Sequence, residues 1–456
     1  AAGGRPMENE KLLEEITYLL EYPTAFYGHF YPSYLEVPAE VLTTSMIEHQ
    51  RYFPVFDNQG QLLPGFIGVR NGTDDNLDIV RAGNERVLKA RLEDALFFWN
   101  EDLRKPLEEM ATGLKDVLFH ERLGSIMDKI ERLQTLAGVI SEACGLSDIT
   151  TLKRAALLCK ADLLSSMVYE FPELQGIMGR YYARKSGEQA EVSQAIFEHY
   201  LPRWAGDILP TTDSGKVLSL AEKIDNLVGF FAIGIKPSGS QDPYALRRQA
   251  LGIVHIILDS GLSLDLAALT GKAYDNFAAL QTDSTREDTV SEVIEFIMQR
   301  MRGVLLEQGY SYDIIDAALA VSSYDIIDIS ARIQGLQELR QSEIFEDFMV
   351  VYNRCHNLSK KWEDDSINVE VLVDESEITL NRSFNLIKYD VYRNINTRNY
   401  LEACKILAGL RPEVDNFFDT VMVMVDDVEL KAARLGLLKA IANLCHLIAD
   451  FSKIVE

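Results

Sequence analysis

Apolar residues recur every three or four positions through most of the chain, which is the spacing of one buried face of an α-helix. The pattern resumes after residue 343, with expected breaks at 364–366, where Asp and Ser cluster, and at 409–412, which contains Gly and Pro. The chain is therefore predicted to be mainly α. The clearest helices in its middle part are expected over 123–140, 152–167 and 217–231.

The first hundred residues follow a different pattern. Strand-like stretches at 52–56 and 65–69 are separated by the turn residues 57–60, which predicts a β-hairpin. A helix with one apolar face is expected over 84–101. The chain therefore begins with an α+β module, and because 456 residues are too many for one core, we expect a multidomain protein.

We expect five segments along the chain. The first ten residues have an Ala/Gly-rich start that is typical of a cloning remnant or a disordered end. Four further segments follow, each with its own pattern of apolar residues. They are an α+β module at 11–111, a helical domain at 112–262, a helical linker at 263–342 and a helical bundle at 343–456.

Composition narrows the classes of partner. The chain has 70 acidic and 45 basic residues, a formal charge of −25, which opposes the approach of RNA phosphates. Any RNA surface must be a local basic patch, and charge alone favours a protein without one. The five cysteines form no Cys-x-x-Cys pair, which argues against a zinc ribbon and a disulfide framework and indicates a reducing cytoplasm. No apolar run approaches the roughly 20 residues that span a bilayer.

The most specific stretch lies at 221–251 and reads AEKIDNLVGFFAIGIKPSGSQDPYALRRQAL. It predicts a helix, a loop, and a second helix capped by Ser240 or Asp242 with Pro243 in its first turn. Basic side chains beside such a loop either contact phosphates or hold acidic partners at an interface, and the sequence leaves both open. These basic residues are Lys236, Arg247 and Arg248.

The same stretch resembles the signature of the β subunit of the bacterial heterotetrameric glycyl-tRNA synthetase. Segments 48–72 and 83–109 are similar to a module of that family related to the tRNA-side insertion of the phenylalanyl enzyme's β subunit. The run LRPEVDNFFD at 410–419, followed by LKAARLGLLKAI, resembles DALR-type anticodon-binding domains. The resemblance spans nearly the whole chain, and it implies an N-terminally truncated β subunit.

The helical domain at 112–262 resembles the HD superfamily, whose metal site uses one His, a His-Asp pair and a distant Asp. Here the pair retains only Asp162, while Asp225 stands for the distant residue and His120 lies upstream. This is a poor ligand set, so we expect no metal. We expect both carboxylates to bond instead to the backbone or to Lys160 and Lys223. An HD-type metal-dependent phosphohydrolase is the alternative function.

Cations alternate with aromatic rings in the C-terminal segment, a combination that can stack on unpaired bases and neutralise phosphates. The alternative is a solvated helix face with its aromatic residues in the core. The resemblance to anticodon-binding domains favours the first interpretation for the domain as a whole. The tRNA-binding candidates in it are Arg354, Lys360, Lys361, Trp362 and Arg411.

The chain shows no phosphate loop and no class I synthetase motif. The resemblance implies that glycine, ATP and Mg bind to a separate α subunit, so we expect no catalytic residue and no cofactor in this chain. It implies a cytoplasmic part of glycine-tRNA ligase that binds and orients tRNA-Gly, with the α subunit and tRNA-Gly as partners and with neither membrane nor DNA. A helical scaffold without an RNA role is the third reading.

Overall fold

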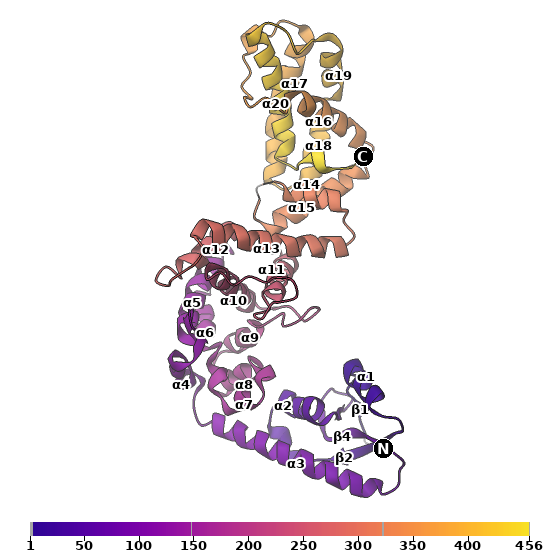
Figure 1. Ribbon diagram of the computed structural model, residues 1–456, viewed down its shortest axis with the longest axis vertical. Coiled ribbons are helices and arrows are strands. Elements are labelled where there is room, and N and C mark those ends of the chain that lie inside the picture. Colours follow the sequence, from indigo (N-terminus) through magenta and orange to yellow (C-terminus); the bar gives the residue numbers. More distant parts are fainter. Residues whose placement is uncertain (1–2, 147, 322, 456) are drawn as a thin grey trace. The chain divides into compact units, whose positions relative to one another are not determined.

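The computed structural model describes residues 3–146, 148–321 and 323–455, and it is mainly helical with a small antiparallel sheet near the N-terminus (Figure 1). The predicted fold class, mainly α with an N-terminal α+β module, is confirmed. The chain divides into two compact units, residues 1–229 with 276–281 and residues 230–275 with 282–456. The division into five segments stays a prediction. Within the described residues, no helix combines the length and apolar character needed to cross a membrane.

The larger sheet lies in the first unit and has the strand order β1-β3-β4-β2, and a separate two-stranded sheet pairs Leu118–His120 (β5) with Gly124–Ser125 (β6). β3 and β4 form the predicted hairpin, whose turn is closed where Asp57 accepts the backbone N–H groups of Gln59 and Gln61. β1 pairs with β3, so residues 5–6 belong to the fold, contrary to the expectation of a remnant or disordered end at 1–10. The strands are Arg5–Pro6 (β1), Pro23–His29 (β2), Phe53–Phe56 (β3) and Leu62–Asn71 (β4).

Aromatic side chains fill the core beneath this sheet. Phe66 on β4 is fully buried and stacks on Tyr52, with ring centroids 4.4 Å apart. Gly68 on the same strand faces Phe26, and an added Cβ there would lie 2.4 Å from that ring, so only glycine fits. The close packing of rings explains why this small sheet folds onto α3 rather than standing alone.

The helical part of the first unit is tied to α3 through one carboxylate. Asp102, at the end of α3, accepts the backbone N–H groups of Ser166 and Met167 and the hydroxyl of Tyr182. The helix predicted over 152–167 is wrong in its second half, because α6 ends at Leu158 and a 3₁₀ turn precedes α7. The helices are Glu10–Leu19 (α1), Ala39–Thr44 (α2), Leu77–Asp102 (α3), Leu107–Thr112 (α4), Ile126–Ala143 (α5), Ile149–Leu158 (α6), Ser166–Glu170 (α7), Ile177–Lys185 (α8), Ala190–Glu198 (α9) and Asp213–Ala232 (α10), the last of which continues into the second unit.

The second unit is helical throughout its described residues. Asp242 caps its first complete helix, as one of the two predicted caps, but Pro243 lies ahead of the helix rather than in its first turn. We call α16 to α20 the C-terminal bundle. The helices are Leu246–Ser260 (α11), Leu266–Asp275 (α12), Arg286–Glu307 (α13), Tyr312–Leu319 (α14), Ile326–Arg340 (α15), Phe345–Ser359 (α16), Glu375–Asn396 (α17), Tyr400–Ala408 (α18), Arg411–Thr420 (α19) and Val428–His446 (α20).

Candidate nucleic-acid interface

A buried ion pair fixes α17 to α20 in the C-terminal bundle. Arg434 on α20 donates from Nε to Oε2 of Glu377 on α17 over 2.6 Å, and both side chains are buried. Oε1 of Glu377 also accepts the backbone N–H of Asp374 at 2.8 Å, which completes a capping box at the start of α17. One carboxylate therefore sets both where α17 begins and which of its faces meets α20.

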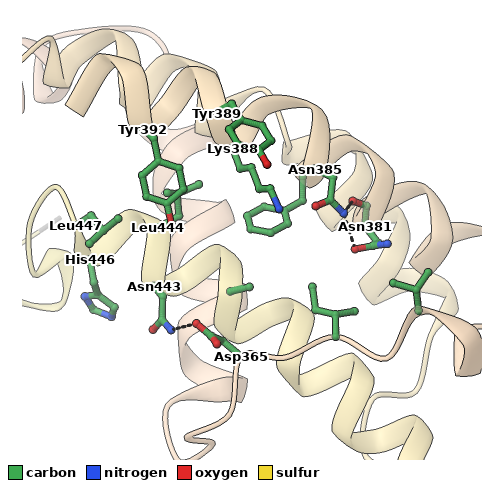
Figure 2. A pocket seen from close by; sticks show the side chains of 14 residues that line it. Asp365, Asn381, Asn385, Lys388, Tyr389, Tyr392, Asn443, Leu444, His446 and Leu447 are labelled. Atoms are coloured by element: carbon green, nitrogen blue, oxygen red, sulfur yellow. Dashed lines mark hydrogen bonds between the residues drawn. The ribbon is translucent and has the colours of Figure 1, made fainter. Parts of the chain in front are cut away.

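A groove of about 910 Å³ opens between α17 and α20, beside the segment 365–369 (Figure 2). The residues from α17 recur at intervals of three or four, so they share one face of the helix. In Figure 2, Lys388 points from α17 into the groove. The groove is lined by Asp365, Ile367, Val369, Asn381, Phe384, Asn385, Lys388, Tyr389, Tyr392, Ala440, Asn443, Leu444, His446 and Leu447.

Exposed rings and a cation dominate the rim of this groove. Tyr389 is 73% exposed and Tyr392 is 45% exposed, although large aromatic side chains are normally buried. Such rings are platforms on which unpaired bases stack, and an ammonium group like that of Lys388 neutralises a backbone phosphate. The combination suits a single-stranded nucleic acid better than an apolar ligand.

Amide side chains that line the groove are held in place by hydrogen bonds. Asn385 donates from Nδ2 to Oδ1 of Asn381 over 3.0 Å, and Asn443 donates from Nδ2 to Oδ2 of Asp365 over 2.9 Å. These bonds leave further donors and acceptors on the amides, which are the groups that read the edges of splayed bases. The sequence analysis missed this groove, although the Asn, Lys and Tyr residues on one face of α17 were a visible signal.

The tRNA-binding candidates predicted from the sequence are not among the described residues that line the groove. Arg354 and Arg411 both pair with Asp415, at 3.0 Å and 3.4 Å, and Arg411 also pairs with Asp347. These ion pairs connect α16 with α19 inside the bundle. They give both arginines a structural role, and their contact with tRNA stays a prediction.

Three further candidates, Lys360, Lys361 and Trp362, directly follow α16. Both lysines are exposed, whereas Trp362 is partly buried and its backbone N–H donates to the carbonyl of Ser359. They precede Asp365 at the edge of the groove by only a few residues. Of the predicted set, they therefore lie nearest to the groove along the chain.

The remaining candidates lie around the start of α11. Lys236 pairs with Glu292 on α13 at 2.6 Å, and Arg247 donates to the carbonyl of Gly239 over 2.8 Å. Arg248, the next residue along α11, is exposed. Glu292 thus neutralises the charge of Lys236, whereas neither Arg247 nor Arg248 forms an ion pair with a carboxylate among the described residues.

Two histidines connect the groove to the core of the bundle. Nδ1 of His356 on α16 lies 3.1 Å from Nε2 of His446, which lines the groove, and Tyr352 stacks against His356. Burial lowers the pKa of both histidines, and the charge of His356 lowers the pKa of His446 further, whereas Asp450 opposes both shifts. The pair is therefore neutral at physiological pH, with one ring donating to the other.

Acidification is expected to weaken the C-terminal bundle. The pKa of a histidine in an unfolded chain is about 6.5. Histidines whose pKa is lowered by folding make their full contribution to the stability of the folded state above this pH, and this contribution is lost as the pH falls through their pKa in the folded state. Thermal unfolding at about pH 7.5 and about pH 5.5 should show a lower midpoint at acid pH, and a smaller loss for His356→Asn, because that substitution removes one of the two protonation sites. An equal loss in both proteins would contradict this role of the pair.

Asp225, the predicted distant HD-like position, lies in a buried network of charges on α10 and α5. Its Oδ2 accepts Nζ of Lys129 at 2.9 Å and its Oδ1 accepts Nε of Arg132 at 2.9 Å. Lys129 also pairs with Glu222. Burial acts to raise the pKa of Glu222, but the charges of Lys129 and Lys160 outweigh burial, so the pKa is lowered. The sequence predicted that Asp225 bonds to the backbone or to Lys160 or Lys223, whereas the structure gives Lys129 and Arg132.

Asp162, the remnant of the HD pair, bonds to the backbone as expected. Its Oδ2 accepts the N–H groups of Gly176 and Gly179 at 2.6 and 2.9 Å, while its buried Oδ1 has no hydrogen-bond partner among the described residues. Burial raises the pKa of Asp162 to about 6, although both N–H donors oppose this shift. The third position, His120, accepts the N–H of Arg122 in a short strand (β5, Leu118–His120).

The side chains at the three HD-like positions do not fit a divalent cation. Lys129 and Arg132 occupy both oxygens of Asp225, and their charges repel a metal ion from the place where an HD-type ligand would be needed. Within the described ranges, no group of three or more His, Cys, Asp or Glu side chains is arranged to hold one. The HD-like positions thus carry a network of ion pairs and hydrogen bonds in place of metal ligands.

Comparison with known proteins finds two matching family models. A family model described as "Glycyl-tRNA synthetase beta subunit" matches residues 1–320, and one described as "DALR anticodon binding domain" matches residues 348–450. A glycine–tRNA ligase beta subunit from Syntrophomonas wolfei is 64% identical over 454 residues, which is 100% of this chain and 66% of that protein. Those from Clostridioides difficile and Moorella thermoacetica are 47% and 46% identical over 99% of this chain.

The two matching family models define the class, that of aminoacyl-tRNA synthetase subunits and their anticodon-binding domains. The chain belongs to the glycyl-tRNA synthetase beta subunit family. It spans 66% of the length of these curated relatives. Neither match supports the metal-dependent phosphohydrolase that the sequence left open.

Proposed function

We propose that this chain binds tRNA-Gly and orients it for ATP-dependent glycylation at the active site of a separate α subunit. The groove between α17 and α20 carries the proposal, because it places two exposed tyrosines and Lys388 in a domain that matches anticodon-binding domains. The relatives are named beta subunits of glycine–tRNA ligase, which supports a partner α subunit. We place the resulting complex, a heterotetramer that serves protein biosynthesis, in the cytoplasm.

The chain would contribute to the reaction by positioning. Holding the anticodon end fixes the tRNA on the synthetase, and this lowers the barrier to charging the distant 3′ end without a catalytic side chain from this chain. ATP and Mg would then bind to the α subunit alone. The ion-paired HD-like positions are compatible with this division of labour, because they already use their carboxylates for folding.

Binding of labelled tRNA-Gly and a noncognate tRNA across a salt series tests the proposal. We expect tighter binding of tRNA-Gly and a steep loss of affinity between about 50 and 200 mM salt, because phosphate contacts release counterions. The same series with α subunit added should show glycylation only when both chains are present. A folded chain that binds neither tRNA at the lowest salt would favour the helical scaffold and contradict the proposal.

A further inference from the structure

A negative charge lines the groove between α17 and α20. Among the described residues around the groove, Asp365 alone carries a carboxylate. Figure 2 shows it bonded to Asn443 of α20, whereas the exposed rings of Tyr389 and Tyr392 come from α17. A negative charge in a groove that takes RNA repels every nearby phosphate. Such a carboxylate is favourable to binding only where it accepts a hydrogen bond from a base.

The backbone around Asp365 is fixed on the surface of α20. The carbonyl groups of Asp364 and Ser366 approach Gly436 so closely that an added Cβ would collide with the carbonyl oxygen of Ser366. The side chain of Asp364 accepts the backbone N–H of Ser366 at 2.9 Å and its hydroxyl at 2.7 Å, which closes the turn. Asn443 follows Gly436 by about two turns, so it lies on the same face of α20. Asp365 is therefore held in place before any ligand binds.

The direction of the bond between Asp365 and Asn443 follows from the two groups. An ionised carboxylate only accepts hydrogen bonds, so the 2.9 Å bond runs from Nδ2 of Asn443 to Oδ2 of Asp365. No other hydrogen bond to the Asp365 carboxylate is found among the described residues, and the side chain is exposed. The groove thus presents a fixed hydrogen-bond acceptor on the wall opposite the rings of α17.

Cytosine and uracil differ in a way that a fixed acceptor can distinguish. Cytosine carries an exocyclic amine at C4, whose N–H groups donate, whereas uracil carries a carbonyl oxygen there, which only accepts. The ring N–H of uracil lies between two carbonyl oxygens, so a carboxylate that meets it is repelled by both. A site built around one polar group rejects the analogue that leaves this group unpaired.

We propose that Asp365, held by Asn443, makes the groove select cytosine over uracil for a base that stacks on the tyrosines of α17. The inference rests on the proposed function, because it requires unpaired RNA in this groove. Lys388 lines the same groove, and its positive charge offsets the repulsion between the carboxylate and the RNA backbone. Rings and a cation bind RNA of any sequence, and Asp365 adds the discrimination between bases.

The variant Asp365→Asn in the full chain tests this selection through binding of oligocytidylate and oligouridylate of equal length at neutral pH. The wild type should bind oligocytidylate roughly tenfold more tightly, as expected for one hydrogen bond to a charged acceptor. The variant should bind both equally, because a carboxamide can accept from the amine of cytosine or donate to the carbonyl of uracil. The matched control Asp419→Asn removes an exposed carboxylate from α19, outside the groove, and should keep the preference. Asn443→Ala should reduce the preference, because it frees the carboxylate to move.

A modified RNA tests the same contact without changing the protein. Oligocytidylate with two methyl groups on N4 has no donor there, and it should bind the wild type as weakly as oligouridylate does. A preference for cytosine that survives Asp365→Asn, or that Asp419→Asn abolishes equally, overturns the inference. A chain that binds tRNA-Gly but does not distinguish the two oligonucleotides also overturns it and leaves the proposed function standing. A folded wild-type chain that binds neither tRNA-Gly nor the oligonucleotides would instead contradict the proposed function itself.

Discussion

Replacing Asp225 with alanine is expected to lower the free energy of unfolding of the first unit by about 3–5 kcal/mol, because it leaves the buried Arg132 without its counter-charge and Lys129 with only the more distant Glu222. Asp225 is 1% exposed and pairs with Lys129 and Arg132, which are also buried. Denaturant unfolding followed by hydrogen exchange would measure the loss and locate it in α5 and α10.

Two further variants make this result specific. Asp213→Ala removes an exposed carboxylate from the same helix, where its 3.7 Å contact with Lys216 is solvent-screened, and should change stability by less than about 1 kcal/mol. Replacing all three charges together, as Lys129→Met/Arg132→Met/Asp225→Leu, should recover much of the loss, because no buried cation is then left unpaired and Glu222 keeps its ion pair with Lys160. A loss below about 1 kcal/mol for Asp225→Ala would contradict a stabilising network.

Local features of the fold were predictable because they depend on neighbouring residues. The hairpin of β3 and β4 follows from the turn at Asp57, whose carboxylate binds two N–H groups within four residues. The pairing of β1 with β3 brings together residues about fifty positions apart, and no local signal in Arg5 or Pro6 indicates it. The break after α6 was also missed, since apolar spacing continues through the 3₁₀ turn.

The HD-like positions show where the spacing of residues in the sequence is not enough to predict the bonding partners of a buried carboxylate. The loss of a histidine beside Asp162 was visible, and it correctly indicated a structural role for that carboxylate. The partners of Asp225 were not visible, because Lys129 and Arg132 lie on α5, more than ninety residues earlier. Their burial depends on how α5 packs, and an isolated Lys or Arg in a sequence is normally read as exposed.

The predicted tRNA-binding candidates illustrate the same limit in the C-terminal bundle. Arg354 and Arg411 were chosen for their charge, but α16 and α19 pack so that Asp415 lies between them. The groove needs α17 and α20 side by side, and their residues are about fifty positions apart in the sequence. The face of α17 that carries Asn385, Lys388 and Tyr392 was nevertheless a pattern that sequence analysis can detect.

Replacing both Tyr389 and Tyr392 with alanine removes two stacking rings and is expected to weaken binding of tRNA-Gly by roughly 30-fold or more. Stacking of an aromatic ring on an unpaired base contributes about 1–3 kcal/mol per base, and about 1.4 kcal/mol corresponds to tenfold in affinity. Tyr389 is 73% exposed, so its removal should leave the fold intact. Fluorescence anisotropy with labelled tRNA-Gly would measure the change.

The controls separate stacking from loss of a surface residue. Tyr389→Phe/Tyr392→Phe keeps both rings and should bind almost normally, whereas Tyr169→Ala removes a tyrosine that is 87% exposed in the first unit and should have little effect. Lys388→Gln should instead make the salt slope shallower by about one, because it removes a cation rather than a ring. Rings and charge would then have separable effects, since stacking depends little on salt and phosphate contacts depend on it strongly. Normal binding by the double alanine variant would show that tRNA does not occupy this groove.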